Sequence, residues 1–561
     1  MANTPFGLCA MAMGADEKKL LVSSLLAYGA FGLLQVGYRL ARSWAEALRA
    51  RRMLKDTPCA HGQEGFMSLA YNMAKNLPRV HDWRVEICAG LPVCKNWGFP
   101  WSCVLSNLFI NTPEGVRHFL KDEFQKYSKG NASVDPFITY FNEFMGGGIF
   151  TVPHGLATCD NGQRWLQMRK TSAQVFNRKN FNTLMQEVFV TKAEALRTWL
   201  DEFVDGEPVD LQLGFFNFTM DSIMKIFFGE DVNSQAGDHN KYGQAFDEAH
   251  EAMFLHTVNS LPFNTLFMTL LPWPFGGAHG LARKLYDLAS PSYRKFRRAL
   301  RVLDSEAHRM VQNCRADVNL FERRDLLALF LQAEKENNYS EAFLKEMVLN
   351  LVIAGRDTTA CALSWMFLEL ARNPKIQSRL CREIDEKLPP GASLDTQTLA
   401  HSQLPYLQGV LYEALRLWPP VPFDSKIAYA DDVLPDGTNV PKGITAVFSP
   451  YILGRDEARY PDPLAFKPER WIPFSAPSPY EFPVFQAGPR ICLGMDMAVF
   501  EAKVVTVQLL RHLRFELAPG QKIGYGVKLT MNVRNGDRDE LMVCVKRRPC
   551  VSSPTASYAG A

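Results

Sequence analysis

The stretch FQAGPRICLG at residues 485–494 places one cysteine, Cys492, between an arginine and a leucine–glycine pair. A thiolate is a nucleophile and a metal ligand, and the glycines at 488 and 494 allow a tight loop that approaches another group closely. Cys492 is therefore a candidate metal ligand. A buried free thiol is the alternative, because cysteine is among the residues most often found inside proteins.

A second candidate site lies in the apolar stretch 341–372, where Asp357 and Thr358 follow Arg356 in the middle of a helical pattern. Burial of an acid and an alcohol is unfavourable unless the two groups are paired or used in chemistry. They are candidates for proton transfer. A kink with a structural salt bridge is the alternative, because a threonine hydroxyl that bonds to the preceding turn loosens a helix.

Two further pairs have the spacing of neighbours on a helix face. Trp165 and Arg169 lie four residues apart, so an indole N–H and a guanidinium could together bind a carboxylate or a propionate. An exposed cation–π pair is the alternative. Glu413 and Arg416 lie three residues apart, and Arg470 follows in the stretch FKPERW. An acid between two arginines would form a buried triad if the fold brings the three together.

The elements that must position these residues are mostly helical. The chain has 561 residues, of which 47% are hydrophobic and 22% charged, and this composition supports a large buried core. The hydrophobic pattern predicts helices at 181–203, 240–258, 341–372 and 493–513. It predicts short strands at 84–90, 101–107, 444–450 and 540–546. The expected fold class is mainly α with small β-sheets.

Composition and missing motifs exclude several classes of protein. A net charge of +3 argues against a nucleic-acid binder. The twelve cysteines form no C-x-x-C pair, which argues against a structural zinc site and favours a reducing compartment. A hydrolase or metalloprotease is excluded because the chain has no G-x-S-x-G, and HEAMF at 250–254 lacks the second histidine.

The N-terminus predicts a single membrane anchor. Residues 20–38 form a run of 19 residues without a charge, which as a helix would span about 28 Å of a bilayer core that is roughly 30 Å thick. The basic residues that follow this run place the main body in the cytoplasm. Ser23, Ser24, Gly29, Gly32 and Gln35 weaken the signal, and a cleaved signal peptide is the alternative. We expect an anchor and its flank at 1–45, a catalytic unit at 46–549 and a disordered tail at 550–561.

Five patterns follow one another along the chain: W-x-x-x-R at 165–169, A-G-x-D-T-T at 354–359, E-x-x-R at 413–416, P-E-R-W at 468–471 and F-x-x-G-x-R-x-C-x-G at 485–494. Their order and spacing resemble the cytochrome P-450 superfamily of haem-thiolate monooxygenases. This resemblance runs over roughly residues 60–547. It implies the cytochrome P-450 fold, with haem between the long central helix and the cysteine loop.

The resemblance also implies a role for each residue. Cys492 would be the thiolate ligand of the iron, and Asp357 and Thr358 would handle protons on the other face of the haem. Ala354 stands where some animal fatty-acid ω-hydroxylases carry a glutamate that is esterified to haem, so we expect non-covalent haem b. The other implied haem-binding residues are Arg490, Trp165 and Arg169 at the propionates, and Phe485, Gly488 and Gly494 in the loop. The implied structural residues are Glu413, Arg416 and Arg470.

The segments 124–130, 419–443 and 454–471 resemble the plant and algal branch of fatty-acid ω-hydroxylases. This implies hydroxylation of fatty acids at the terminal carbon, with O2 and with electrons from NADPH through NADPH-cytochrome P-450 reductase at the endoplasmic reticulum membrane. Arg164 and Lys170 are candidate reductase contacts. The alternatives are the same chemistry on a sterol, terpenoid or carotenoid, a lipid-hydroperoxide isomerase or lyase, and a non-catalytic haem sensor. Such isomerases typically lack the central-helix threonine that Thr358 provides here.

Overall fold

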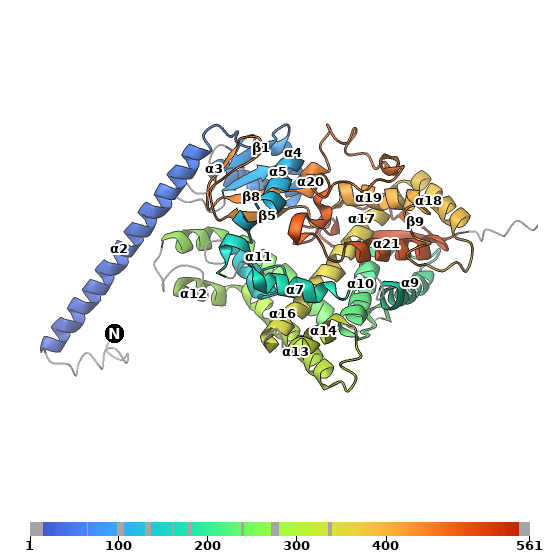
Figure 1. Ribbon diagram of the computed structural model, residues 1–561, viewed down its shortest axis with the longest axis horizontal. Helices are drawn as coiled ribbons and strands as arrows, with labels where there is room; N and C mark the ends of the chain where they lie inside the picture. Colours follow the sequence, from blue (N-terminus) through green and yellow to red (C-terminus); the bar gives the residue numbers. More distant parts are fainter. Residues whose placement is uncertain are drawn as a thin grey trace, which may run out of the picture.

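A computed structural model of the protein describes residues 15–63, 66–97, 106–129, 136–159, 162–176, 181–236, 241–270, 280–334 and 339–548. Helices make up most of these residues, and the strands are short, so the predicted fold class is confirmed (Figure 1). The predicted disordered tail at 550–561 lies outside the described residues.

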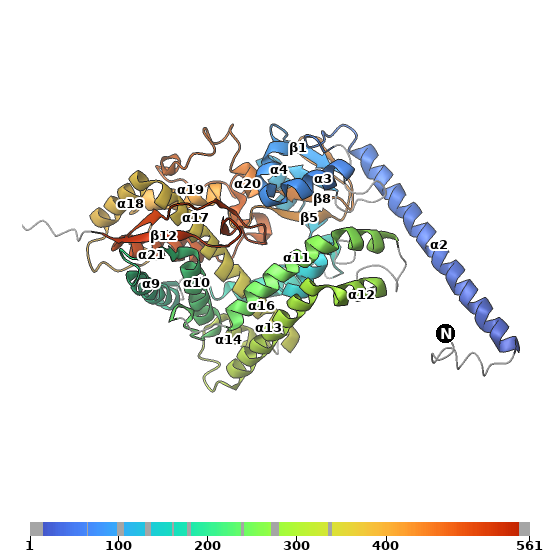
Figure 2. The same cartoon turned by 180° about the vertical axis from the view of Figure 1, so that it is seen from behind.

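The α-helices account for the bulk of the molecule and pack into one body, from which the N-terminal part of the long first helix extends (Figures 1 and 2). Their bounds are α2 (Ala15–Met53), α3 (Phe66–Asn76), α4 (Val80–Cys88), α5 (Pro113–Arg117), α6 (Pro136–Met145), α7 (Gln163–Ala173), α9 (Gln186–Asp201), α10 (Leu211–Phe228), α11 (Lys241–Leu270), α12 (Leu281–Ala289), α13 (Pro291–Ala316), α14 (Leu326–Gln332), α16 (Glu341–Val352), α17 (Thr358–Arg372), α18 (Pro374–Lys387), α19 (Pro405–Leu417), α20 (Pro450–Leu453) and α21 (Met495–Leu510).

The strands form one five-stranded sheet, in the order β1-β2-β8-β5-β3, and three smaller sheets. Strand β8 pairs parallel with β2 and antiparallel with β5. The smaller sheets pair β4-β12-β9, β10-β11 and β6-β7. The strands are β1 (Val93–Asn96), β2 (Asn107–Ile110), β3 (Tyr127–Ser128), β4 (Val209–Asp210), β5 (Asp424–Ala428), β6 (Asp432–Val433), β7 (Asn439–Val440), β8 (Thr445–Phe448), β9 (Leu513–Leu517), β10 (Ile523–Tyr525), β11 (Val533–Asn535) and β12 (Met542–Arg547).

The central helical stretch predicted at 341–372 is confirmed, and it runs through the middle of the molecule as α16 and α17 (Figure 2). The Ser340 hydroxyl caps its start by accepting a hydrogen bond from the Phe343 N–H at 3.2 Å. Its end lies at Arg372, just before Asn373-Pro374, where proline disfavours helical geometry in the preceding residue. Between the two helices the backbone widens into a π-helical turn at Ile353–Asp357, which is the loosening expected from the sequence.

Most of the other predicted elements are present at shifted bounds. Helices α9, α11 and α21 and strands β8 and β12 occupy the predicted helical and strand stretches. The predicted strand at 84–90 is wrong, because this segment belongs to helix α4. The buried residues Val80, Trp83 and Ile87 have the three-to-four-residue spacing of a helix face, which outweighs the short alternation at Val85 and Ile87. Most of the predicted strand at 101–107 lies outside the described residues.

The predicted membrane anchor coincides with the long helix α2, which extends away from the body of the molecule in both views (Figures 1 and 2). Within the described part of the chain, no helix is both long and apolar enough to cross a membrane. The predicted transmembrane span is therefore not confirmed. The serines, glycines and glutamine within residues 20–38 make this stretch less apolar than its lack of charge suggests.

Candidate active site

A cavity of about 1950 Å3 lies at the junction of the central helix, the loop at 483–494 and the five-stranded sheet. Apolar side chains make up most of its wall. Most of the candidate residues from the sequence line it: Cys492, Arg490, Trp165, Arg169, Phe485, Gly494 and Thr358. Residues far apart in the sequence thus meet at one cavity, which is the arrangement expected of an active site.

The Cys492 loop is held in shape by its own backbone. The Cys492 N–H donates a hydrogen bond to the Phe485 carbonyl at 2.9 Å, and helix α21 begins three residues further on at Met495. The Cys492 side chain is exposed to the cavity, although protein surrounds the site on most sides. This enclosure raises the pKa of the Cys492 thiol, while the Gly494 N–H and the charge of Arg169 oppose the rise. A cation bound to the sulfur would favour the thiolate further.

The two glycines of the loop differ in what they permit. Gly488 has φ of +64°, and a Cβ there would lie 2.1 Å from the Leu120 carbonyl oxygen, so this glycine lets the loop pack against the Leu120 backbone rather than against a ligand. A Cβ at Gly494 would meet the Cys492 sulfur at 3.9 Å, which is an ordinary contact. Gly488 does not line the cavity, and its expected role beside the cofactor stays a prediction.

The three residues expected at the propionates come together beside the loop. Arg169 on α7 donates to the Ile491 carbonyl at 2.6 Å, and Arg490 donates to the Val152 carbonyl at 2.6 Å. The Arg490 guanidinium lies 4.5 Å from the centre of the Trp165 ring, and its Nε lies 3.1 Å from His154 Nδ1. Burial lowers the pKa of Arg490 to about 10, so Arg490 stays charged at neutral pH.

The two residues of the central helix face different surroundings. Thr358 lines the cavity, and its hydroxyl donates to the Ala354 carbonyl at 2.5 Å. Asp357 does not line the cavity. The Asp357 carboxylate instead contacts other protein groups. It lies 3.0 Å from Arg356 Nη1 and 3.5 Å from His250 Nδ1. Burial opposes its ionisation, but the hydrogen bond to His250 and the charge of Arg356 hold the pKa of Asp357 below its usual value. The expectation that both residues face the cavity is thus met by Thr358 alone.

Glu413, Arg416 and Arg470 do meet. Glu413 and Arg416 are fully buried and 2.8 Å apart, and Arg470 Nε lies 3.2 Å from the same carboxylate. The Trp471 indole N–H also donates to Glu413, at 3.0 Å, and Arg416 donates to the carbonyls of Gly454, Pro463 and Ala465. Glu413, Arg416 and Arg470 thus pair with one another and with the neighbouring backbone, and none of the three lines the cavity.

Sequence reasoning missed a polar group on the same cavity wall. Lys426 on β5 lies 2.6 Å from Asp424, and Lys129 approaches the other carboxylate oxygen at 3.0 Å. Burial lowers the pKa of Lys426 to about 7, although the Asp424 charge opposes the shift. The only sequence signal was the surrounding stretch 419–443, which carried family resemblance but no local pattern.

The donor set of this cavity fits haem. A thiol faces it from one element, and the guanidiniums of Arg169 and Arg490 and the ammonium of Lys426 face it from others. A planar apolar cofactor with one soft ligand and two carboxylates needs these groups. Arg164 and Lys170, the candidate reductase contacts, are both exposed on α7, the helix that also carries Trp165 and Arg169.

The sequence model of the family described as Cytochrome P450 matches residues 106–525, which is most of the chain. The chain belongs to the cytochrome P450 family. It is similar to Cytochrome P450 CYP94D108 of Paris polyphylla, with 30% identity over 481 residues that cover 83% of this chain and 88% of that protein. It is also similar to Cytochrome P450 86B1 of Arabidopsis thaliana, with 29% identity over 84% and 82% of the two chains. A third relative is Alkane hydroxylase MAH1 of Arabidopsis thaliana, with 28% identity over 84% and 91%.

Membership of this family makes the protein a monooxygenase, an oxidoreductase that carries haem with a cysteine thiolate as axial ligand. The family reaction requires O2, an apolar substrate and a reductase that supplies electrons.

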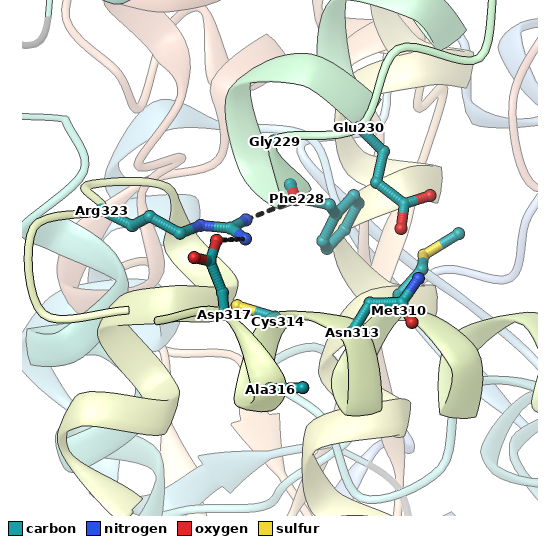
Figure 3. A pocket seen from close by; sticks show the side chains of 9 residues that line it. All are labelled: Phe228, Gly229, Glu230, Met310, Asn313, Cys314, Ala316, Asp317 and Arg323. Carbon is teal, nitrogen blue, oxygen red and sulfur yellow. Dashed lines mark hydrogen bonds and ion pairs between the residues drawn. The ribbon is translucent and has the colours of Figure 1, made fainter. Parts of the chain in front are cut away.

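A second, smaller pocket of about 380 Å3 lies where α10 ends against α13 (Figure 3). Arg323 spans it, donating to the Phe228 carbonyl at 2.8 Å and pairing with Asp317 at 3.0 Å. The guanidinium thus satisfies the last turn of α10, a structural role. Cys314 in its wall is buried, and burial raises the pKa of its thiol to about 12, so Cys314 remains protonated.

Proposed function

We propose that this cytochrome P450 hydroxylates fatty acids at or near the terminal carbon. The observation that carries the proposal is the large, mainly apolar cavity, whose wall includes both Cys492 and Thr358. A mainly apolar wall favours an apolar substrate. The similarity to a relative named as an alkane hydroxylase supports an aliphatic substrate. The same chemistry on a sterol, terpenoid or carotenoid is the competing proposal.

The residues of this chain have distinct tasks in that reaction. Bound haem with its thiolate ligand supplies the activation of O2 and the insertion of one oxygen atom into a C–H bond. Cys492 is the ligand that we propose, held in place by the hydrogen bond from its N–H to Phe485. Arg169 and Arg490 would hold the propionates by charge, and Lys426, paired with Asp424, would add a hydrogen-bond donor beside them. The apolar cavity wall excludes water from the reacting carbon.

Thr358 is the residue that we propose for proton handling. Thr358 lines the cavity, and its hydroxyl donates to the Ala354 carbonyl, so it is held at a fixed place directly after the widened helical turn. A hydroxyl both donates and accepts a proton, which suits it to pass protons from water to the reaction site.

Electrons would come from NADPH through NADPH-cytochrome P-450 reductase, with the exposed Arg164 and Lys170 of α7 as contacts. Attachment to the endoplasmic reticulum membrane through residues 1–45 stays a prediction. It is tested by comparing the membrane fraction of the full chain with that of a variant that lacks these residues.

The test of the proposed function is turnover. Purified protein, reductase and NADPH would be supplied with fatty acids of several lengths, alkanes, sterols and terpenoids, and mass spectrometry would locate the inserted oxygen. We expect oxygen at the terminal carbon of a fatty acid. Turnover of another class with fatty acids untouched would overturn the substrate assignment while leaving the family chemistry intact.

A further inference from the structure

The charged side chains on the cavity wall differ in whether they have a partner. Several are paired within the protein. The pairs are Arg49 with Asp431, Lys129 and Lys426 with Asp424, and Lys528 with Asp539. Arg490 and Arg169 donate to backbone carbonyls. Arg84 on α4 lines the same cavity and, within the described part of the chain, neither forms an ion pair nor donates a hydrogen bond.

Arg84 is half-buried, and its Nη1 atom is shielded from water without a hydrogen-bond partner among the described residues. Its guanidinium lies over the ring of Phe423, whose centre is 4.3 Å away. Burial lowers the pKa of Arg84 to about 10, which leaves it charged at neutral pH. A buried charge without a partner is costly, so its position calls for an anion that the protein does not supply.

The neighbours of Arg84 do not supply that anion. Asp82, two residues away, accepts hydrogen bonds from the hydroxyls of Tyr451 at 2.6 Å and Tyr525 at 3.1 Å. His81 stays neutral, because burial and the charges of Arg84 and Arg455 lower its pKa to about 3. The positive charge of Arg84 therefore has no anion at this part of the cavity wall, because the nearby Asp82 carboxylate already accepts two hydrogen bonds.

We propose that Arg84 binds the carboxylate of the fatty-acid substrate. This inference rests on the proposed function and deepens it, since it assigns the acid end of the substrate. A guanidinium binds a carboxylate through two parallel hydrogen bonds, which gives affinity and fixes orientation. The apolar residues Val447, Val527 and Leu529 line the cavity that Arg84 shares with Cys492. An acid held at Arg84 therefore extends its apolar chain along this wall toward the reaction site.

The proposal sets a rule for the substrate class. A free carboxylic acid satisfies Arg84, whereas a methyl ester or an alkane of the same length leaves the charge unpaired in the cavity. Discrimination between acid and ester then comes from the unpaired polar group rather than from chain length.

The test uses the full-length holoprotein and isothermal titration calorimetry, so that binding is measured apart from turnover. The ligands are dodecanoic acid and its methyl ester. Arg84→Gln should weaken binding of the acid by about tenfold to hundredfold and leave the ester within about twofold. Arg84→Lys should lose less, because lysine keeps the charge but not the two-pronged geometry. Arg79→Gln is the matched control. It removes a positive charge next to α4 that pairs with Glu86 outside the cavity, and acid binding should not change.

The outcomes separate this inference from the proposed function. If wild type hydroxylates fatty acids and Arg84→Gln weakens acid and ester equally, or neither, then the carboxylate assignment alone is overturned. If wild type neither binds nor hydroxylates fatty acids and another substrate class turns over, both the proposed function and this inference fail.

Discussion

Arg416 and Arg84 each lie over an aromatic ring, but they differ in their polar partners. Arg416 is fully buried, pairs with Glu413 at 2.8 Å and donates to three backbone carbonyls. Arg84 lines the cavity against the ring of Phe423, with no anion from the described residues beside it. The fully paired arginine stabilises the fold, and the unpaired one leaves its charge for a ligand. The two arginines thus differ in whether the described part of the protein supplies an anion to the guanidinium.

The largest effect on stability should follow from breaking the paired set. Arg416→Gln leaves the Glu413 carboxylate buried without its main partner, and we expect the free energy of unfolding to fall by about 3–5 kcal/mol. Urea unfolding followed by tryptophan fluorescence measures this. The control is Arg379→Gln, which breaks a half-exposed ion pair with Glu469 and should cost less than about 1 kcal/mol. Equal losses in the two variants would contradict the structural role of the triad.

A smaller effect should come from His81, the neutral neighbour of Arg84. Its pKa in the folded state, about 3, lies below the usual 6.5, so the unfolded chain binds the proton more tightly. Stability is therefore not reduced by His81 above pH 6.5. As pH falls below this value, the unfolded chain takes up the proton and the free energy of unfolding decreases. At pH 5 the wild type should have lost about 2 kcal/mol more than His81→Gln.

Urea unfolding at pH 7.5 and pH 5 measures this difference. The same pH dependence in His81→Gln as in wild type would show that burial and the neighbouring charges of Arg84 and Arg455 do not lower the pKa of His81.

On the cavity side, Thr358→Ala should leave the fold and the haem content unchanged but divert electrons. We expect product formed per NADPH to fall about tenfold, with hydrogen peroxide in its place. Thr257→Ala is the matched control, because Thr257 also lines the cavity and bonds back one turn to the Met253 carbonyl at 2.8 Å. Tight coupling in Thr358→Ala, or equal uncoupling in both variants, would contradict the proton role.

The smallest effect on stability should follow from Arg84→Gln. Removing an unpaired charge leaves no partner behind, so we expect the free energy of unfolding to stay within about 1 kcal/mol of wild type or to rise. The same urea titration applies. A loss as large as that of Arg416→Gln would mean that Arg84 is satisfied by the protein, and the comparison would fail.

The sequence could predict those features of the site that depend on local spacing. The Glu413–Arg416 spacing, the Trp165–Arg169 spacing and the Cys492 loop are local patterns, and their geometry follows from helix periodicity and glycine positions. The direction of Asp357 depends on His250, which approaches from α11. The exposure of Arg84 to the cavity depends on Phe423, which follows α4 only after several intervening elements. Such packing between distant segments leaves no local pattern, and the segment with Arg84 was even predicted as a strand.

The assignment of Cys492 as the haem ligand is central, because the roles proposed for the other cavity residues depend on where the haem is bound. The measurement is the absorption spectrum of the reduced carbon monoxide complex of wild type and Cys492→Ala. We predict a thiolate-type spectrum in wild type that is lost in the variant. An unchanged spectrum in Cys492→Ala would contradict the assignment of Cys492 as the haem ligand.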